Sequence, residues 1–162
     1  MSGTIVQLSI SPGGVPKLPI EAATVGEMGI QGDKQRDAKH HGGPERALCL
    51  WSIERIEALQ AEGHPIFAGA AGENVTVRGI DWDRVVPGVR LRLGEVLCEV
   101  SRYTTPCDNN ARWFTNGEFV RMGQKLHPGW SRVYARVLQG GTLRPGDEVE
   151  LIPARAPVTA GE

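Results

Sequence analysis

Short apolar segments separated by turn residues run along most of the chain. Residues 4–10 (TIVQLSI) and 18–25 are rich in β-branched residues, and the turn signal SPGG lies between them. Residues 47–51 (ALCLW) form a continuous apolar run of the length typical of a buried strand. We therefore predict a strand in each of these three ranges.

One segment instead repeats with the period of a helix. In residues 52–63 (SIERIEALQAEG), Ser52 is placed to cap the first turn and Gly63 to end the last. Three apolar residues fall on one stripe of this helix: Ile53, Ile56 and Leu59. Residues 111–126 contain enough aromatic and helix-forming residues for a second helix, which we expect to be short and irregular.

The second half of the chain predicts mostly strands. Residues 89–100 (VRLRLGEVLCEV) alternate apolar and polar positions on both sides of Gly94-Glu95, which predicts a hairpin. Residues 130–138 and 140–152 predict a second pair of strands joined by a glycine-rich loop. Many short strands with one or two short helices indicate a mainly β fold (β-rich α+β), a closed or nearly closed antiparallel β-barrel. Closure would remove exposed sheet edges.

The composition is that of one ordinary globular domain. The 162 residues suit a single core, which we place in residues 1–153, followed by a flexible tail, 154–162. The net charge of −1 gives no overall field for nucleic acid, and no apolar run approaches the roughly 20 residues of a membrane span. We therefore expect neither nucleic acid nor membrane as a partner. An odd number of cysteines, without CxxC spacing or a secretion signal, predicts a cytoplasmic protein.

The three cysteines occupy different sequence environments. Cys49 lies within a predicted buried strand and Cys98 alternates with valines, so both are interpreted as small buried hydrophobes. Cys107, in TTPCDNN, follows a strand and a proline and precedes turn-favouring residues, which predicts an accessible thiol. Arg102 and Arg112 lie nearby in the sequence and would favour its thiolate. Cys107 is either a reactive thiol or a residue that fills a turn.

The stretch KHHGGPERAL, residues 39–48, could hold a metal, hold an anion or merely turn the chain. Adjacent histidines point in opposite directions in an extended segment, and the usual zinc spacings are absent, so we do not expect a metal held by His40 and His41. Glycine loops with uncovered amides bind anions when cationic side chains surround them. The residues with these properties are Gly32, Lys34, Arg36, Lys39, Gly42, Gly43 and Arg46. His41, beside the glycines, is our candidate for orienting a ligand or moving a proton.

Two more groups could belong to the same pocket. Arg132 and Arg136 lie four residues apart in a strand pattern, so they would share a face. Gly72 reads as part of a turn that enters a strand. Glu73 and Asn74, which follow it, could anchor that loop or touch a ligand, and the sequence leaves both alternatives open.

Four stretches together resemble the MOSC domain, named after the C-terminal part of molybdenum cofactor sulfurases. They are IQGDKQRDAKHHGGPERAL, GENVTV, TTPC and the ending GW…ARVLQGG…GDEVEL. The resemblance extends from about Ile5 to Leu151, in the order of the family. It implies a barrel-like β fold and a role with the molybdenum cofactor or with carried sulfur.

The resemblance also implies roles for individual residues. Cys107 matches the family's cysteine, whose thiolate either ligates molybdenum or carries a persulfide sulfur. The family's cofactor is a pterin with a dithiolene and a phosphate, which the basic glycine loop would suit. The cofactor-binding residues implied are Lys39, His40, Gly42, Gly43, Arg46, Asn74 and Arg112, with His41 joining Cys107 in catalysis.

Three functions follow from this resemblance. The first is a small molybdenum-cofactor oxidoreductase, for instance one that reduces N-hydroxylated compounds. The second is a sulfur carrier with a persulfide on Cys107, and the third is a non-catalytic cofactor-binding module. The chain has no aminotransferase-like portion, hence no pyridoxal phosphate site, and no cysteine spacing for an iron–sulfur cluster. An external reductase or a cysteine desulfurase would therefore be the partner, with a small-molecule substrate, and we favour the enzyme.

Overall fold

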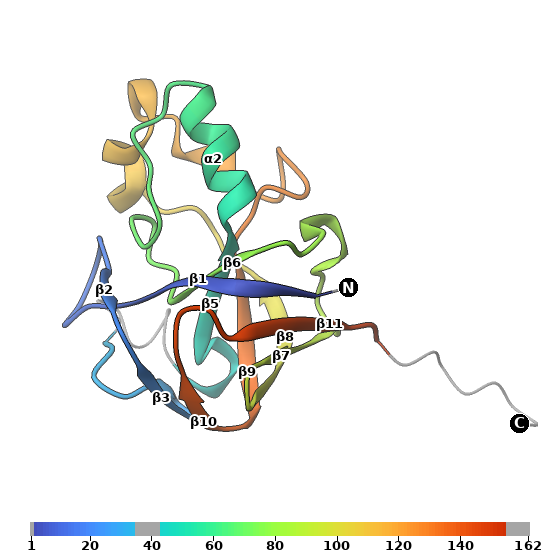
Figure 1. Cartoon of the computed structure of the whole chain (residues 1–162). Helices are drawn as coiled ribbons and strands as arrows, with labels where there is room; N and C mark the ends of the chain where they lie inside the picture. Colours follow the sequence, from blue (N-terminus) through green and yellow to red (C-terminus); the bar gives the residue numbers. More distant parts are fainter. Residues whose placement is uncertain (1, 35–42, 155–162) are drawn as a thin grey trace, which may run out of the picture.

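A computed structural model of the chain describes residues 2–34 and 43–154. Its larger sheet has eight strands: β1 (Ser2–Ile10), β2 (Leu18–Ile20), β5 (Leu48–Ser52), β6 (Val75–Arg78), β7 (Arg90–Leu93), β8 (Val96–Tyr103), β9 (Val133–Gln139) and β11 (Glu148–Ile152). The strand order is β11-β7-β8-β9-β5-β6-β1-β2, and a further pairing between β11 and β1 closes seven strands into a barrel (Figure 1). The predicted closed barrel is confirmed.

One pairing of the barrel is parallel, the one between β5 and β6. A parallel pair needs a crossover connection, and α2 (Ile53–Ala61) lies in this one. The Ser52 hydroxyl accepts a hydrogen bond from the Arg55 amide at 3.2 Å, so the predicted N-cap is present. Ile56 and Leu59 are fully buried, which explains the apolar stripe. The parallel pair is the one departure from an all-antiparallel barrel.

The predicted hairpin is formed by β7 and β8. Leu91 pairs with Cys98 and Leu93 with Val96, and all four side chains are buried in the core. The period-2 alternation of this segment therefore places one face of the hairpin inside the barrel. Cys98 is a core residue, as the sequence predicted.

The two ends of the barrel are covered by different structures (Figure 1). A small sheet of β3 (Ala23–Gly26), β4 (Gly29–Ile30) and β10 (Gly141–Leu143) lies at one end. At the other end lie α2 and a run of short 3-10 helices: η3 (Asp108–Trp113), η4 (Thr115–Gly117) and η5 (Phe119–Met122). These three replace the single irregular helix predicted for residues 111–126. Two more 3-10 helices occur elsewhere, η1 (Pro44–Arg46) and η2 (Trp82–Arg84).

Two predicted strand arrangements are wrong. Residues 18–25 form two strands, because β2 pairs with β1 whereas β3 pairs with β4 and β10. The last two long strands are not neighbours: β9 lies between β5 and β8, and β11 lies between β1 and β7. Residues 141–143, expected in a simple loop, form β10, which carries the chain to the small sheet.

Apart from Ala154, the predicted tail lies outside the described residues. In the part of the chain that is described, no helix is both long enough and apolar enough to cross a membrane.

Candidate functional site

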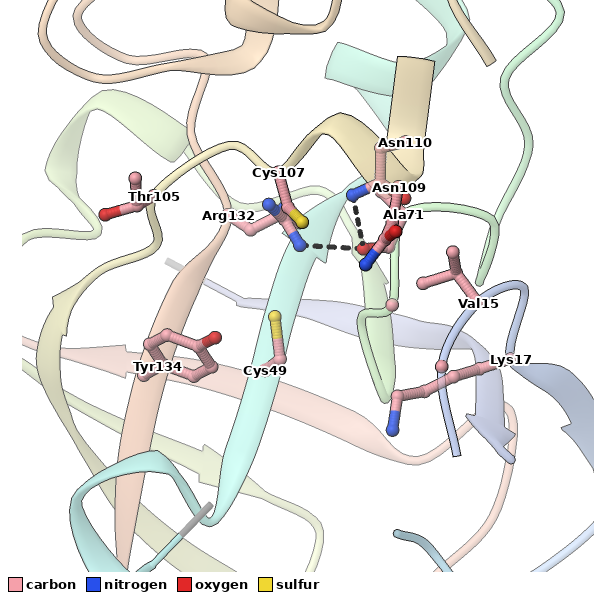
Figure 2. A pocket seen from close by; sticks show the side chains of 12 residues that line it. Val15, Lys17, Cys49, Ala71, Thr105, Cys107, Asn109, Asn110, Arg132 and Tyr134 are labelled. Atoms are coloured by element: carbon pink, nitrogen blue, oxygen red, sulfur yellow. Dashed lines mark hydrogen bonds between the residues drawn. The ribbon is translucent and has the colours of Figure 1, made fainter. Parts of the chain in front are cut away.

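A pocket of about 80 Å³ opens near the barrel end that carries the 3-10 helices, and Figure 2 shows the side chains that line it. Five separate segments contribute to its lining: residues 14–17, Cys49 of β5, residues 71–72, residues 105–110 and residues 132–134. This volume has room for only a few water molecules, so side chains on opposite walls are close together.

Cys107 lies at the point where β8 has ended and η3 begins. Its backbone is extended (φ −120°, ψ 143°) and its side chain is partly exposed and lines the pocket. The sulfur lies 3.7 Å from Oδ1 of Asp108. A partly exposed thiol at a cavity is open to reaction and to metal ligation.

Cys49 also lines the pocket, which corrects the interpretation of this residue as a plain core hydrophobe. It is buried, as predicted, but its thiol faces the cavity from β5 (Figure 2). Burial raises the pKa of Cys49 to about 11, although Arg132 and Lys17 act in the opposite direction. The sequence could not reveal this position because the neighbouring residues of the run are all core residues.

Arg132 is the most unusual charged residue of the pocket. Its side chain is buried, with the residue 6% exposed, and Nη1 donates to the carbonyl of Ala71 at 2.7 Å. Nε has no hydrogen-bond partner, and among the described residues no carboxylate lies within ion-pair distance of the guanidinium. Burial raises the pKa of the Glu73 carboxyl, whereas the charge of Arg132 acts to lower it. A buried guanidinium without an ion-pair contact among the described residues is a favourable place for an anionic ligand.

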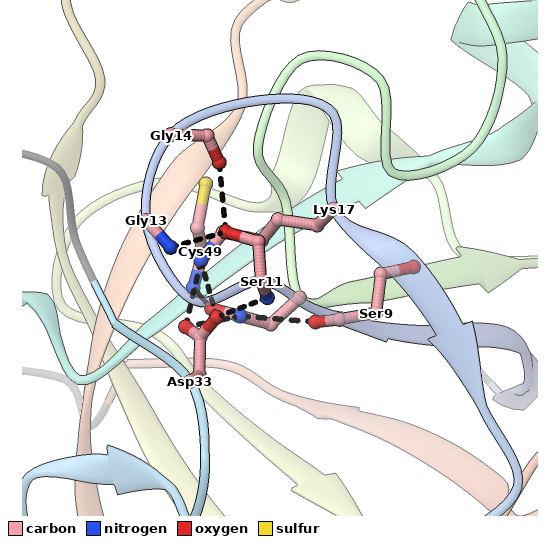
Figure 3. A network of polar contacts seen from close by, with 8 residues as sticks. Ser9, Ser11, Gly13, Gly14, Lys17, Asp33 and Cys49 are labelled. Carbon is pink, nitrogen blue, oxygen red and sulfur yellow. Dashed lines mark hydrogen bonds and ion pairs between the residues drawn. The ribbon is translucent and has the colours of Figure 1, made fainter.

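Lys17, in contrast, is fully compensated. Its Nζ lies 2.6 and 2.7 Å from the two oxygens of Asp33, and both side chains are about 95% buried, at 4% and 5% exposure. Asp33 also accepts hydrogen bonds from the Ser11 amide and from Nδ2 of Asn74 (Figure 3). This ion pair joins residues 14–17 of the pocket wall to the segment that contains Asp33.

Asn74 connects this ion pair to the pocket. Its Oδ1 accepts a hydrogen bond from the Cys49 amide at 3.0 Å, and its Nδ2 donates to the Ser9 carbonyl as well as to Asp33. The residue is 1% exposed and does not line the cavity. The anchoring alternative therefore has direct support for Asn74, which holds Cys49 in place.

The other predicted site residues either do not line the pocket or lie outside the described residues. Lys39, His40, His41 and Gly42 lie outside the described residues, and Gly43 precedes η1. Arg46 lies over the ring of Tyr134, 5.7 Å from its centroid, so it neighbours the pocket through a lining residue. Arg112 donates to the Val15 carbonyl and stacks on Trp113 at 4.6 Å.

Of the two arginines expected to share a pocket, only Arg132 lines it. Arg136 instead forms ion pairs with Glu45 and Glu99 at 2.8 and 2.7 Å. Within residues 2–34 and 43–154, no cluster of three or more His, Cys, Asp or Glu side chains is placed to hold a metal ion.

Lys17, Asp33, Asn110 and Tyr134 were not singled out by the sequence. Asn110 is 2% exposed and donates to the Ala71 carbonyl at 3.2 Å, while its Oδ1 has no partner. Burial raises the pKa of Tyr134 to about 12, so its hydroxyl stays protonated at neutral pH. The residues around Lys17 and Asp33 in the sequence do not reveal their role, because the partners of both side chains are remote in the sequence.

Gly69→Ala is expected to lower the free energy of unfolding by about 2–5 kcal/mol. Gly69 has φ +87°, and a Cβ there would lie 2.5 Å from the Lys17 carbonyl oxygen and 2.9 Å from Oγ of Ser9. The left-handed backbone costs about 1–2 kcal/mol for alanine, and crowding adds about 1–3 kcal/mol. Urea unfolding measures the change.

Gly88→Ala is the matched control, because φ is +98° there and a Cβ would meet nothing within 4 Å. Equal losses in the two variants would contradict the crowding.

Comparisons with known proteins show the family to which the chain is similar. A family model described as the MOSC domain matches residues 37–150. The chain is 33% identical over 141 residues to "Uncharacterized protein YflK" of Bacillus subtilis (strain 168), covering 86% of this chain and 63% of YflK. It is 29% identical over 157 residues to "Protein YiiM" of Escherichia coli (strain K12), covering 93% of this chain and 69% of YiiM. The chain thus spans about two thirds of the length of these curated relatives.

Solved structures of related proteins have the same fold. The crystal structure of YiiM from Geobacillus stearothermophilus superposes with a TM-score of 0.69 at 27% identity, covering 93% of this chain and 75% of that one. The crystal structure of YiiM from Escherichia coli gives a TM-score of 0.73 at 24% identity, covering 98% of this chain and 73% of that one. The latter likeness bears on the fold alone.

Proposed function

Because the chain belongs to the MOSC domain family, we propose that it binds a molybdenum cofactor at the pocket of Cys107 and acts as a small oxidoreductase. The observation that carries this proposal is the uncompensated cation of Arg132 in the same cavity as the Cys107 thiol. A thiolate is a soft metal ligand, and a buried guanidinium favours an anion. A cofactor that combines a soft metal with an anionic pterin satisfies both.

The residues of the pocket fit the metal end of such a group in their donor set. Nε of Arg132 and Oδ1 of Asn110 are buried and lack partners, so the pocket offers one donor and one acceptor to a ligand. The cavity of about 80 Å³ has room for the metal end of a cofactor but not for a whole pterin. The remainder of the cofactor would lie outside the cavity.

Each pocket residue has a role in this proposal. Cys107 supplies the thiolate that ligates the metal. Arg132, with Lys39 and Arg46, binds the anionic part of the ligand, and Asn74 holds the Cys49 strand against the pocket. His41 or the Tyr134 hydroxyl is a proton source, since a reduction consumes protons. The bound cofactor would supply the two-electron chemistry, and an external reductase would supply the electrons. N-hydroxylated small molecules are the proposed substrates.

Removal of the thiol is expected to remove the metal. In protein made by a host that synthesises the cofactor, Cys107→Ala should lower the molybdenum content at least about 10-fold, because the protein's own metal ligand is lost. Elemental analysis of wild type and variant measures this. Cys98→Ala is the matched control, since Cys98 is buried in the core away from the pocket. Molybdenum retained in the folded Cys107→Ala protein would contradict the proposed ligand, and turnover of N-hydroxylated compounds by loaded wild type tests the activity.

A sulfur carrier is the second candidate function. It is favoured by the accessibility of Cys107, since a carrier thiol must be reached by a cysteine desulfurase, and Cys49 and Cys98 are both buried. Incubation with a desulfurase and cysteine, followed by mass spectrometry, tests it. If Cys107 gains one sulfur atom and the protein takes up no molybdenum, the sulfur-carrier function would be favoured over the oxidoreductase function.

A further inference from the structure

Two thiols face each other across the pocket. Cys49 extends from β5 and Cys107 from the start of η3, and in Figure 2 their sulfur atoms point towards one another. The cavity between them has room for only a few water molecules. The proposed function uses Cys107 alone and leaves the second thiol without a role.

The surroundings of Cys49 suit a thiol that reacts only with a nearby partner. Its side chain is buried, so a bulky reagent cannot reach it. The charged groups that act on it are the cations Arg132 and Lys17 and the acids Glu73 and Asp33. Arg132 lines the same cavity as both thiols, so a cationic side chain lies at the place where they would react.

We propose that Cys49 is the resolving thiol of Cys107, and that hydrogen peroxide converts the pair into an intramolecular disulfide. In the first step the Cys107 sulfur attacks peroxide: an S–O bond forms, the O–O bond breaks, and one water leaves with the thiol proton. In the second step the Cys49 sulfur attacks the sulfenic acid: the S–S bond forms, the S–O bond breaks, and a second water leaves. Two thiols are oxidised and one peroxide is reduced, so atoms and electrons balance.

Formation of this bond requires one of the two cysteines to move. A disulfide needs Cβ atoms about 3.5–4.5 Å apart, so one residue must be able to adjust. Cys49 is held firmly, because β5 pairs with β6 and β9 and its amide bonds to Asn74. Cys107 begins a 3-10 helix and its side chain makes no capping hydrogen bond. The adjustment therefore falls on the irregular segment at Cys107, and the barrel stays unchanged.

This modification extends beyond the proposed function and does not depend on it, because both thiols belong to the chain without cofactor. A disulfide would occupy the sulfur that either proposed function needs. It would also shield Cys107 from irreversible oxidation, since a sulfenic acid that is not captured proceeds to sulfinic acid. A dithiol reductant would restore both thiols.

Peptide mapping without reduction tests the proposal on the purified, cofactor-free chain. After treatment with peroxide, free thiols should fall from three to one, and the intact mass should decrease by two hydrogen atoms. Trypsin separates the cysteines, since residues 47–55, 93–102 and 103–112 are three different peptides. The expected product links 47–55 to 103–112 and leaves 93–102 unlinked.

Variants separate the resolving role from other outcomes. Cys98→Ala should form the same linked peptide, whereas Cys49→Ala should accumulate sulfinic acid on Cys107. A wild-type protein in which peptide 47–55 keeps its free thiol while Cys107 becomes sulfinic acid would overturn the proposal. So would a linkage found only between two chains, seen as a dimer on a non-reducing gel. The wild-type map decides the question even if the Cys49 variant does not fold.

Discussion

Asp33→Ala is expected to lower the free energy of unfolding by about 3–5 kcal/mol, the usual loss when one partner of a buried ion pair is removed. The Lys17 ammonium, 2.6 Å from the carboxylate and buried with it, would remain as an uncompensated buried charge. The Ser11 amide and the Asn74 side chain would each lose an acceptor as well. Urea unfolding of the cofactor-free protein measures the loss.

Two controls show whether the buried charge is the cause. Adding Lys17→Met to Asp33→Ala removes the stranded cation, so a large part of the lost stability should return. Glu57→Ala breaks an exposed ion pair with Arg78, 3.4 Å long, and should cost less than about 1 kcal/mol. If Asp33→Ala destabilises no more than Glu57→Ala, the account of Lys17 as a buried, fully compensated cation is wrong.

Arg132→Met should change ligand affinity and stability in opposite directions. Loss of a buried guanidinium that pairs with an anion costs about 2–5 kcal/mol of binding, so cofactor affinity should fall at least about 30-fold. The cofactor-free protein should keep its stability or gain some, because a buried cation without a counter-charge is removed and Asn110 still donates to the Ala71 carbonyl. Molybdenum content after dialysis and the urea midpoint of the cofactor-free form measure the two effects.

Arg136→Met is the matched control for this experiment. Arg136 is four residues further along, but it pairs with Glu45 and Glu99 and does not line the pocket. We expect a loss of stability of up to about 1 kcal/mol and an unchanged molybdenum content. A cofactor-free Arg132→Met protein that is strongly destabilised would show that the guanidinium has a counter-charge within the folded chain.

The parts of the fold that depend on neighbouring residues could be predicted from the sequence. The α2 helix and the β7–β8 hairpin are examples, because Ser52 and Gly94-Glu95 act on residues only a few positions away. The partner strands of β9 and β11 could not be predicted, since each of the two pairs with strands that are remote in the sequence. A strand's period shows which face is buried, but not which strand lies beside it.

The same distinction applies to the candidate site. Cys107 could be selected because its own surroundings, a proline before it and turn residues after it, set it apart from the core. Cys49 could not, because an apolar run looks the same whether one of its side chains meets the core or a cavity. Arg132 was selected by its charge and spacing, but its burial and its hydrogen bond to the Ala71 carbonyl depend on a segment remote in the sequence.

Five segments, spread from residue 14 to residue 134, build the pocket. The pocket can therefore form only at a late stage of folding. No two of these segments form the site by local contacts, and contacts between distant segments form late because they require large loops to close. A nascent or partly folded chain therefore lacks the assembled pocket, unlike small metal-dependent domains in which the metal directs folding. Under either proposed function, the cofactor or the sulfur would have to be delivered after the barrel has closed.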